Sequence, residues 1–256
     1  MSSATIINNS RLGGRFFRLS LRWKCGGVLP GQFVMLRVSN SLDPFLRRPF
    51  GIYDFSGDVL DILYKVVGKG TGMLSTLAPG TDVDILGPLG NGFPPAGKGK
   101  NPIMVAGGIG IAPFYLFAGE VKEGKPSLFY GAKGRDEVAL LKDFKSRGLK
   151  LNIRVSTEDG SIGRKGLVTD ILKERLGEDS VVYACGPAGM LKEVSNIARK
   201  RGVKCYVSLE RAMACGIGVC LGCAVKTRKH PPASAYRMVC SDGPVFNGEE
   251  IDWGCF

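Results

Sequence analysis

The sequence is poor in histidine and in long apolar runs. It contains one histidine and two tryptophans in 256 residues. A single histidine excludes a metal centre that needs two imidazole ligands, such as a Rieske-type centre. No apolar run reaches the roughly 20 residues of a membrane-spanning helix, and the opening "MSSATIINNSRLGG" lacks the apolar segment of a secretory signal. We therefore expect a cytoplasmic protein without a membrane partner.

Acidic side chains are also scarce, with 23 Asp and Glu against 35 Lys and Arg, so the net charge is +12. The basic residues are spread along the chain, and the densest runs are "RKRGVK" and "KTRKH". No segment is typical of a nucleic-acid module. We expect a solvated basic surface and no nucleic-acid partner, with His230 solvated in a loop. A basic nucleic-acid binder stays an alternative, which predicts salt-sensitive retention on DNA and no bound flavin.

The first hundred residues carry short, β-branched segments separated by glycine and proline. "GQFVMLRV", "PFGIYDF", "VLDILYKVV" and "TDVDILG" each indicate a strand. The turns between them contain "LPGQ", "FSGD", "APGT" and "GPLGNGFPP". Many short strands without a convincing helix favour a small antiparallel β-barrel.

The pattern changes after the small, basic stretch "AGKGKN", which is typical of a linker. Apolar strands then alternate with helical segments, from "PIMVA" to "AGMLKEVSNIARKRG". This alternation predicts a Rossmann-like parallel sheet covered on both faces. A cysteine-containing segment and a short tail follow. We predict a multidomain β plus α/β protein with domains at 1–97, 98–205 and 206–256.

Four of the eight cysteines have the spacing of an iron–sulfur site. Cys215, Cys220 and Cys223 follow C-x4-C-x2-C, the plant-type [2Fe–2S] pattern, and Cys240 supplies a fourth thiolate. Such a cluster needs a tight loop that aims backbone N–H groups at sulfur. The loop glycines Gly216, Gly218 and Gly222 allow positive φ. A structural zinc site in an interaction or regulatory module stays an alternative, although only Cys220 and Cys223 form the C-x2-C pair that zinc favours.

Two glycine turns follow apolar strands of the second domain. In "VAGGIGIAPFY", Gly107, Gly108 and Gly110 open a helix whose free N–H groups suit a phosphate. In "ACGPAGM", Cys185 and Gly186 end a later strand. Because parallel strands bind ligands at their carboxyl ends, we expect both turns at one edge of the sheet, with Cys185 and Gly186 bordering a nicotinamide.

The acidic pair Glu158 and Asp159 follows the strand "IRVST". Carboxylates there repel a 2′-phosphate and accept hydrogen bonds from a free ribose, which favours NAD over NADP.

The predicted barrel carries its own candidates for anion binding. Arg48 and Lys65 are cations beside strands and suit a pyrophosphate. Gly70 and Thr71 offer backbone N–H and hydroxyl groups to a phosphate, and Tyr64 is placed to lie against a flavin or a ribose. Taken singly, each of these residues also fits a surface cation or a barrel aromatic.

Together, "PGQFVMLRV", "RRPFGI", "GPLGNGF", "VAGGIGIAPF" and "ACGPAGM" resemble the ferredoxin–NADP reductase superfamily. The tail "SLERAMACGIGVCLGCAVKT" with "MVCSDGPVFNGEEIDW" resembles one branch of it, the electron-transfer subunits of NAD-dependent (class B) dihydroorotate dehydrogenases. The resemblance covers essentially the whole chain. It implies an FAD-binding barrel, an NAD-binding domain and a [2Fe–2S] domain.

Particular residues follow from the resemblance. It implies that Cys215, Cys220, Cys223 and Cys240 ligate the cluster. One position departs from the superfamily, which usually has Ser or Thr where this chain has Gly51, so only a backbone N–H is available to the flavin there. The residues that the resemblance assigns to FAD are Arg48, Pro49, Phe50, Gly51, Leu63, Tyr64, Lys65, Gly70 and Thr71.

The resemblance also implies a partner and a direction of electron flow. The partner is an FMN-containing catalytic subunit that oxidises dihydroorotate in pyrimidine synthesis, in a heterotetramer with two copies of each chain. Electrons run from that FMN through the cluster and FAD to NAD+. This chain has no evident acid–base residues for dihydroorotate, so we do not expect it to oxidise that substrate alone. The alternative is a related reductase subunit that serves ferredoxin or sulfide.

Overall fold

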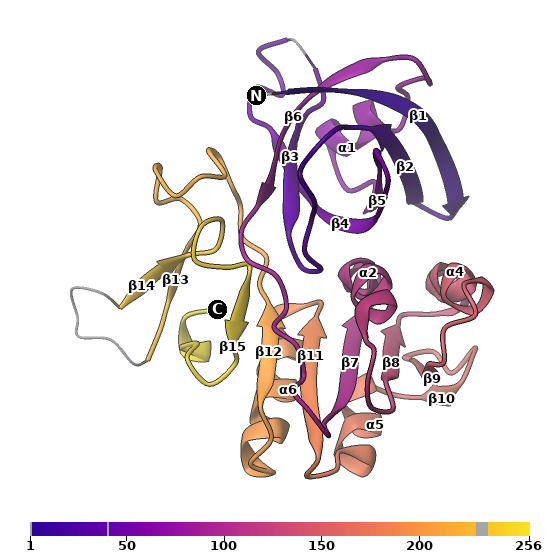
Figure 1. The fold of residues 1–256 in the computed structure, drawn as a ribbon, viewed down its shortest axis with the longest axis vertical. Helices are drawn as coiled ribbons and strands as arrows, with labels where there is room; N and C mark the ends of the chain where they lie inside the picture. Colours follow the sequence, from indigo (N-terminus) through magenta and orange to yellow (C-terminus); the bar gives the residue numbers. More distant parts are fainter. Residues whose placement is uncertain (1, 40, 229–234) are drawn as a thin grey trace.

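The computed structural model describes residues 2–39, 41–228 and 235–256, so the prediction for His230 lies outside the described residues. The N-terminal part is a closed barrel with strand order β1-β2-β5-β4-β3-β6, antiparallel throughout (Figure 1). This confirms the predicted barrel. Its strands are β1 (Ser2–Gly13), β2 (Phe16–Arg22), β3 (Phe33–Arg37), β4 (Arg48–Ser56), β5 (Val59–Lys65) and β6 (Asp82–Leu89).

The barrel interior is filled by aliphatic side chains from alternate strand positions. Leu19, Leu21, Ile52 and Ile62 are fully buried. One helix, α1 (Lys69–Leu74), follows β5 and places the fully buried Leu74 in the same core. The expectation of a barrel without a helix was wrong here, because two glycines in "KGTGML" hide the helical pattern and tertiary packing of Leu74 outweighs their low propensity.

The second part is a seven-stranded sheet with order β10-β9-β8-β7-β11-β12-β15. The strand pairs from β10 to β12 are parallel, as predicted, whereas β15 pairs with β12 in the antiparallel direction. The strands are β7 (Asn101–Gly107), β8 (Ser127–Ala132), β9 (Asn152–Thr157), β10 (Arg164–Lys165), β11 (Ser180–Cys185), β12 (Cys205–Ser208) and β15 (Val245–Asn247).

Helices cover both faces of this sheet. α2 (Ala112–Glu120) lies between the sheet and the barrel (Figure 1), and α5 (Val168–Arg175) and α6 (Ala188–Lys200) pack on the opposite face. The helix expected from "EVALLKDFKSRG" is broken into three short turns. The short elements are η1 (Gly108–Ile111), α3 (Arg135–Val138), η2 (Ala139–Leu141) and α4 (Lys142–Ser146).

The C-terminal part contains a small hairpin and returns to the sheet. The hairpin is β13 (Ala224–Lys226) and β14 (Tyr236–Met238), and η4 (Trp253–Cys255) follows β15. β12 continues across the predicted boundary at residue 205, and β15 pairs with it, so the last two parts share one core. The division into three domains at the predicted residues stays a prediction.

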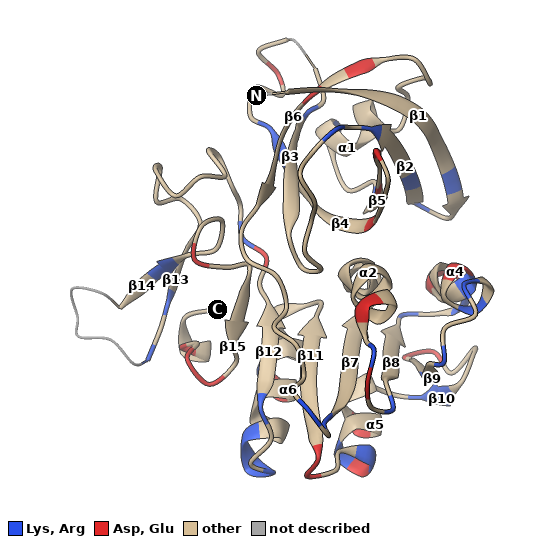
Figure 2. Cartoon of the chain, in the orientation of Figure 1, with Lys and Arg blue, Asp and Glu red and all other residues tan. Residues whose placement is uncertain are grey.

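Lys and Arg residues are distributed over the barrel, the helices and the β13–β14 hairpin (Figure 2). Among the described helices, none has both the length and the hydrophobicity needed to cross a membrane.

Candidate functional site

The two glycine turns lie against each other, as their strands predict. β7 and β11 are neighbours, with Ala106 opposite Cys185. A Cβ on Gly107 would lie 2.8 Å from Pro187 Cδ, and one on Gly186 would lie 3.0 Å from the backbone nitrogen of Gly107. Any larger residue at these two positions would separate the turns. The expectation that both turns share one sheet edge is therefore confirmed.

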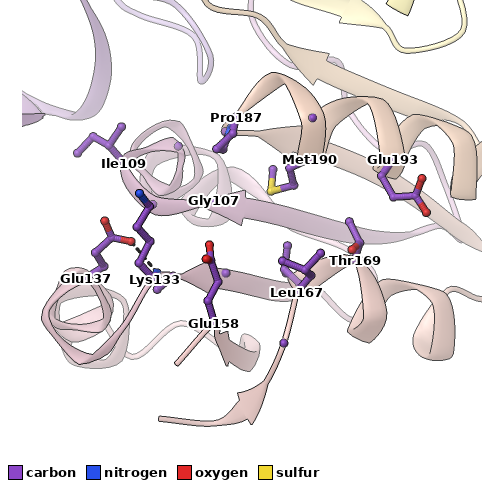
Figure 3. Close-up of a pocket in the computed structure, with 18 of the residues that line it drawn as sticks. Gly107, Ile109, Lys133, Glu137, Glu158, Leu167, Thr169, Pro187, Met190 and Glu193 are labelled. Atoms are coloured by element: carbon purple, nitrogen blue, oxygen red, sulfur yellow. Dashed lines mark hydrogen bonds between the residues drawn. The ribbon is translucent and has the colours of Figure 1, made fainter. Parts of the chain in front are cut away.

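A cavity of about 470 Å³ opens above these turns. Gly107, Gly108, Gly110, Gly186 and Met190 are among the residues that line it, and Figure 3 shows Gly107 and Met190 among the labelled residues. The cavity lies at the carboxyl ends of the strands, which is where a dinucleotide binds in a sheet of this kind.

Two acidic residues follow β9 at the rim of this cavity. Glu158 lines it, and its carboxylate lies between Lys133 and Leu167 in Figure 3. Asp159 instead turns back on its own loop and accepts a hydrogen bond from the Ser161 backbone N–H at 2.9 Å, which lowers the pKa of Asp159. Of the two predicted acids, Glu158 is the one that lines this cavity, and its contact with a ribose stays a prediction.

The barrel contributes one cation to the same edge. Lys65 Nζ lies 3.2 Å from Glu137 Oε1 and 4.9 Å from the ring centre of Phe16. Glu137 Oε2 in turn accepts a hydrogen bond from the Lys133 backbone N–H at 3.0 Å (Figure 3). The predicted cation Lys65 is therefore already neutralised by a carboxylate of the second part.

A second cavity of about 540 Å³ lies between the barrel and the sheet. β4 lines it with Pro49, Phe50 and Gly51, and the other side carries Cys185 and the segment 208–213. A Cβ on Gly51 would meet no atom within 4 Å, so the backbone of β4 is open to a bound ring. A cavity of this volume beside an uncovered strand fits a flavin. The predicted residues that line it are Pro49, Phe50, Gly51, Leu63, Tyr64, Lys65, Thr71, Gly110 and Cys185.

Two of the predicted flavin contacts have local structural roles in this structure. The Tyr64 ring stacks on Phe17 with ring centres 5.5 Å apart, and its hydroxyl donates to Asn9 Oδ1 at 2.9 Å. The Thr71 hydroxyl oxygen accepts the backbone N–H of Val67 at 2.9 Å. Both residues still line the cavity, so their flavin contacts stay predictions.

Arg48 and Gly70 lie next to each other and outside the lining of this cavity. The Arg48 guanidinium donates to the Leu46 carbonyl oxygen. A Cβ on Gly70 would come within 3.0 Å of Arg48 Nε, so glycine leaves room for the guanidinium there. Their contacts with the cofactor also stay predictions.

The four predicted cysteines come together in two pairs. Cys223 Sγ and Cys240 Sγ are 3.2 Å apart, and the Cys220 backbone N–H donates to Cys215 Sγ at 3.4 Å. Further backbone donors surround the sulfurs, such as the N–H of Gly218, 3.1 Å from Cys240 Sγ. Thiolate sulfurs wrapped by N–H groups suit an iron–sulfur cluster. Among residues 2–39, 41–228 and 235–256, no three His, Cys, Asp or Glu side chains are grouped as ligands of one ion.

The environments of the two pairs differ. Hydrogen bonds from the backbone N–H groups of Ile217 and Cys220 lower the pKa of the Cys215 thiol to about 6. Burial, together with the neighbouring Cys223 thiol, raises the pKa of Cys240 to about 12. Cys215 therefore favours the thiolate, whereas Cys240 favours the protonated thiol until a metal displaces its proton.

The backbone of the loop differs from one expectation. Gly216 and Gly218 have positive φ, at 76° and 82°, as predicted. Gly222 does not; Leu221 has a φ of 58° instead, a conformation that is costly for a bulky side chain. The strain lies next to Cys220, between Cys220 and Cys223.

The segment between β12 and the first cysteine lines a site that was not predicted from the sequence. Glu210, Arg211 and Met213 line the cavity assigned to flavin. Burial raises the pKa of Glu210. The available signal was its position: "SLERAMAC" runs from the end of a parallel strand, where ligands bind, directly to Cys215.

This fold and these sites define an NAD-linked flavoprotein oxidoreductase of the ferredoxin reductase type with an added [2Fe–2S] segment. Family models agree. Residues 210–252 match the iron–sulfur cluster binding domain of dihydroorotate dehydrogenase B, and residues 104–196 match the oxidoreductase NAD-binding domain.

Relatives cover nearly the whole chain. An electron transfer subunit of dihydroorotate dehydrogenase B (NAD(+)) from Caldanaerobacter subterraneus is 43% identical, over 97% of each chain. That of Bacillus caldolyticus is 42% identical, over 96% of each chain. The chain belongs to this family, the electron transfer subunits of dihydroorotate dehydrogenase B.

Solved structures show the same architecture. A chain of the NADH-dependent reduced ferredoxin-NADP oxidoreductase, described for flavin-based electron bifurcation, is 30% identical with a TM-score of 0.85, covering 99% of this chain and 91% of that one. An Amycolatopsis cytochrome P450 reductase is 22% identical with a TM-score of 0.67, covering 78% of this chain and 65% of that one, and shows the fold alone.

Proposed function

We propose that this chain carries electrons between an FMN-containing, dihydroorotate-oxidising subunit and NAD+, in a heterotetramer with two copies of each chain. The observation that carries the proposal is the continuity of the three sites. The segment 208–213 lines the flavin cavity, and Cys215 of the first sulfur pair follows it directly. Cys185 lines the same cavity, and its neighbour Gly186 lines the nucleotide cavity.

The residues divide into three groups along this path. Gly107, Gly108, Gly110 and Gly186 would hold the dinucleotide at the carboxyl edge of the sheet. Residues of β4 and β5, with Pro49, Phe50 and Gly51 at the open strand, would hold FAD. When bound, FAD supplies the chemistry that joins hydride exchange with a nicotinamide to single-electron exchange with an iron–sulfur cluster. Cys215, Cys220, Cys223 and Cys240 would hold the cluster.

The loop around the cluster also offers a surface for the partner. Ile217, Val219 and Leu221 are 54%, 74% and 64% exposed, and Cys220 between them is exposed as well. Apolar side chains around a redox centre favour close contact with another protein over contact with water. We assign this surface to the FMN-containing subunit, because electrons from that subunit must enter the cluster across it.

The test is reconstitution with the partner. The chain, purified without oxygen, should contain one FAD and two irons, and should support NAD+ reduction by dihydroorotate only when the FMN-containing subunit is added. An absence of flavin and iron in the purified chain would refute the cofactor assignment. Activity with dihydroorotate in the absence of the partner would refute the division of labour.

The 30% identity to the ferredoxin-linked oxidoreductase chain favours a second candidate, transfer to a ferredoxin. The same reconstituted chain distinguishes the two. The second candidate would be favoured if the chain reduces ferredoxin with NADH faster than it reduces NAD+ together with the dihydroorotate-oxidising partner.

A further inference from the structure

Arg211 has an unusual setting at the wall of the flavin cavity. It lines that cavity, four residues before the cluster ligand Cys215. Its guanidinium carbon lies 4.1 Å from the ring centre of Phe256, and its Nη2 lies 3.5 Å from the Cys255 carbonyl oxygen. The tail of the chain therefore holds the guanidinium from one side.

The hydrogen bonding of Arg211 is incomplete. Its Nε is buried and has no hydrogen-bond partner among the described residues. Within the same described ranges, no carboxylate is close enough to form an ion pair with it. A buried donor without a partner is unfavourable, so the setting of Arg211 points to a role for its charge beyond packing.

Arg211 is the unpaired cation of the cavity. The cavity is lined by three ionisable side chains that carry charge near neutral pH: Lys65, Glu210 and Arg211. Lys65 is paired with Glu137. Within the described ranges, neither Glu210 nor Arg211 has an ion-pair partner. Of the two cations on the cavity wall, Arg211 is therefore the one that no carboxylate neutralises.

We propose that the Arg211 cation, supported by Phe256, stabilises the negative charge that FAD gains on reduction. Arg211 acts from the side of the cavity that leads to the cluster. This inference rests on the proposed function, since it requires FAD in this cavity. A fixed cation near a ring that becomes anionic favours the reduced form, and the low polarity of the cavity strengthens the effect.

The rigid support explains why the tail packs here. A planar guanidinium stacks on an aromatic face, and a lysine ammonium does not reproduce that geometry. Phe256 also contacts Trp253, with ring centres 5.3 Å apart, and Trp253 is buried and donates to the Gly248 carbonyl oxygen at 3.0 Å. Phe256 is thereby anchored to the core that carries β12 and β15.

The experiment measures the equilibrium between oxidised and reduced flavin in the holoprotein by spectroelectrochemistry. Arg211→Met removes the charge and keeps an unbranched side chain. It should raise about tenfold the ratio of reduced to oxidised mediator at which half of the FAD is reduced. Arg211→Lys keeps the charge without the stacking on Phe256, so it should shift the ratio by about threefold and not tenfold. Phe256→Ala keeps the charge and removes its support, and should shift the ratio by about threefold. Arg199→Met, an exposed arginine of α6, is the matched control and should leave the ratio unchanged.

An Arg211→Met ratio equal to that of Arg199→Met, with FAD still bound, would overturn the inference and leave the proposed function intact. If Arg211→Met loses its flavin, Phe256→Ala decides: a wild-type ratio in that variant overturns the inference. A merely structural role would change the melting temperature of Arg211→Met and not the ratio. If the wild-type protein itself lacks flavin, the proposed function fails instead.

Discussion

Gly110 and Cys185 are in direct contact through their backbones. The position that a Cβ would take on Gly110 is occupied by the carbonyl group of Cys185 and the backbone nitrogen of Gly186. The first glycine turn therefore closes against the second, and this contact fixes the floor of both the nucleotide cavity and the flavin cavity.

Gly110→Ala should separate the two turns. The new methyl group meets backbone atoms, which cannot rotate away, so we expect a loss of about 1–3 kcal/mol in the free energy of unfolding. Affinity for NADH should also fall by about tenfold or more, since 1.4 kcal/mol is a factor of ten. Urea denaturation and fluorescence titration would measure the two effects. Gly177→Ala is the control, because its Cβ would approach only Ser180 Oγ, at 3.8 Å; equal effects in both variants would contradict the role of the contact.

Cys220→Ser should separate the flavin reaction from the cluster reaction. A serine oxygen is a poorer ligand for iron than a thiolate, so the cluster should be lost or impaired and NAD+ reduction through the partner abolished. Reduction of a dye by NADH should remain near wild type, because it needs only the flavin. Iron content and the two assays would be compared with Cys255→Ser, whose exposed thiol lies outside the sulfur pairs. Loss of both activities in Cys220→Ser, with FAD still bound, would contradict the proposed electron order.

Substitutions of Gly51 by larger residues test whether FAD binds in the cavity beside β4. Because a Cβ there meets nothing within 4 Å, Gly51→Ser should keep full FAD content. Gly51→Leu projects a large side chain into the cavity and should lower FAD affinity by about tenfold or more. Both apoproteins should be at least as stable as wild type, since glycine weakens a strand interior. Flavin fluorescence after dialysis measures retention; wild-type retention in Gly51→Leu would place the flavin elsewhere.

The cluster loop should be the docking surface for the partner. Val219→Asp introduces a charge at a side chain that is 74% exposed. The variant should keep its iron and its dye activity, but its affinity for the FMN-containing subunit should fall by about tenfold or more. Leu42→Asp provides the comparison, because Leu42 is 81% exposed on the barrel. Equal binding of the partner by the two variants, measured by analytical ultracentrifugation, would exclude this surface.

The Arg47–Asp84 pair makes a prediction for acid stability. Arg47 Nε and Nη2 donate to the two carboxylate oxygens of Asp84, at 2.7 and 2.9 Å, and these bonds lower the pKa of Asp84. A lowered folded-state pKa gives stability that is present above the unfolded value near 3.9 and is lost as the pH falls through the folded value. Asp84→Asn should therefore cost about 1 kcal/mol or less at pH 7, given the partial exposure of the pair.

The cost of Asp84→Asn should shrink as the pH falls below the unfolded value near 3.9, and it should disappear below the lowered folded-state pKa, where the wild-type carboxyl group is protonated in both states. Asp58→Asn is the control, since Asp58 approaches Arg22 only to 3.9 Å. A cost for Asp84→Asn that is the same at pH 3 and pH 7 would show that the pair contributes through packing rather than charge.

Much of the architecture, and the loop that carries the cysteines, were predictable from local patterns. Alternating short strands predicted the barrel, strand–helix alternation predicted the sheet, and the C-x4-C-x2-C spacing predicted a loop with sulfur ligands. These features depend on residues close in sequence, so their physics is visible in a short window. The helix Lys69–Leu74 and the strand Cys205–Ser208 were missed because packing of Leu74 and pairing with β11 decide them.

The sequence alone determined which chemical groups this protein has: the thiols, the glycine turns and the basic residues of the barrel. Only the tertiary structure decided which of them meet. It paired Lys65 with Glu137, 72 positions away, turned the Tyr64 ring onto Phe17, and placed Arg211 between the flavin cavity and Phe256. Such contacts depend on how separate elements pack, and no periodicity or spacing within a segment encodes the distance between two elements.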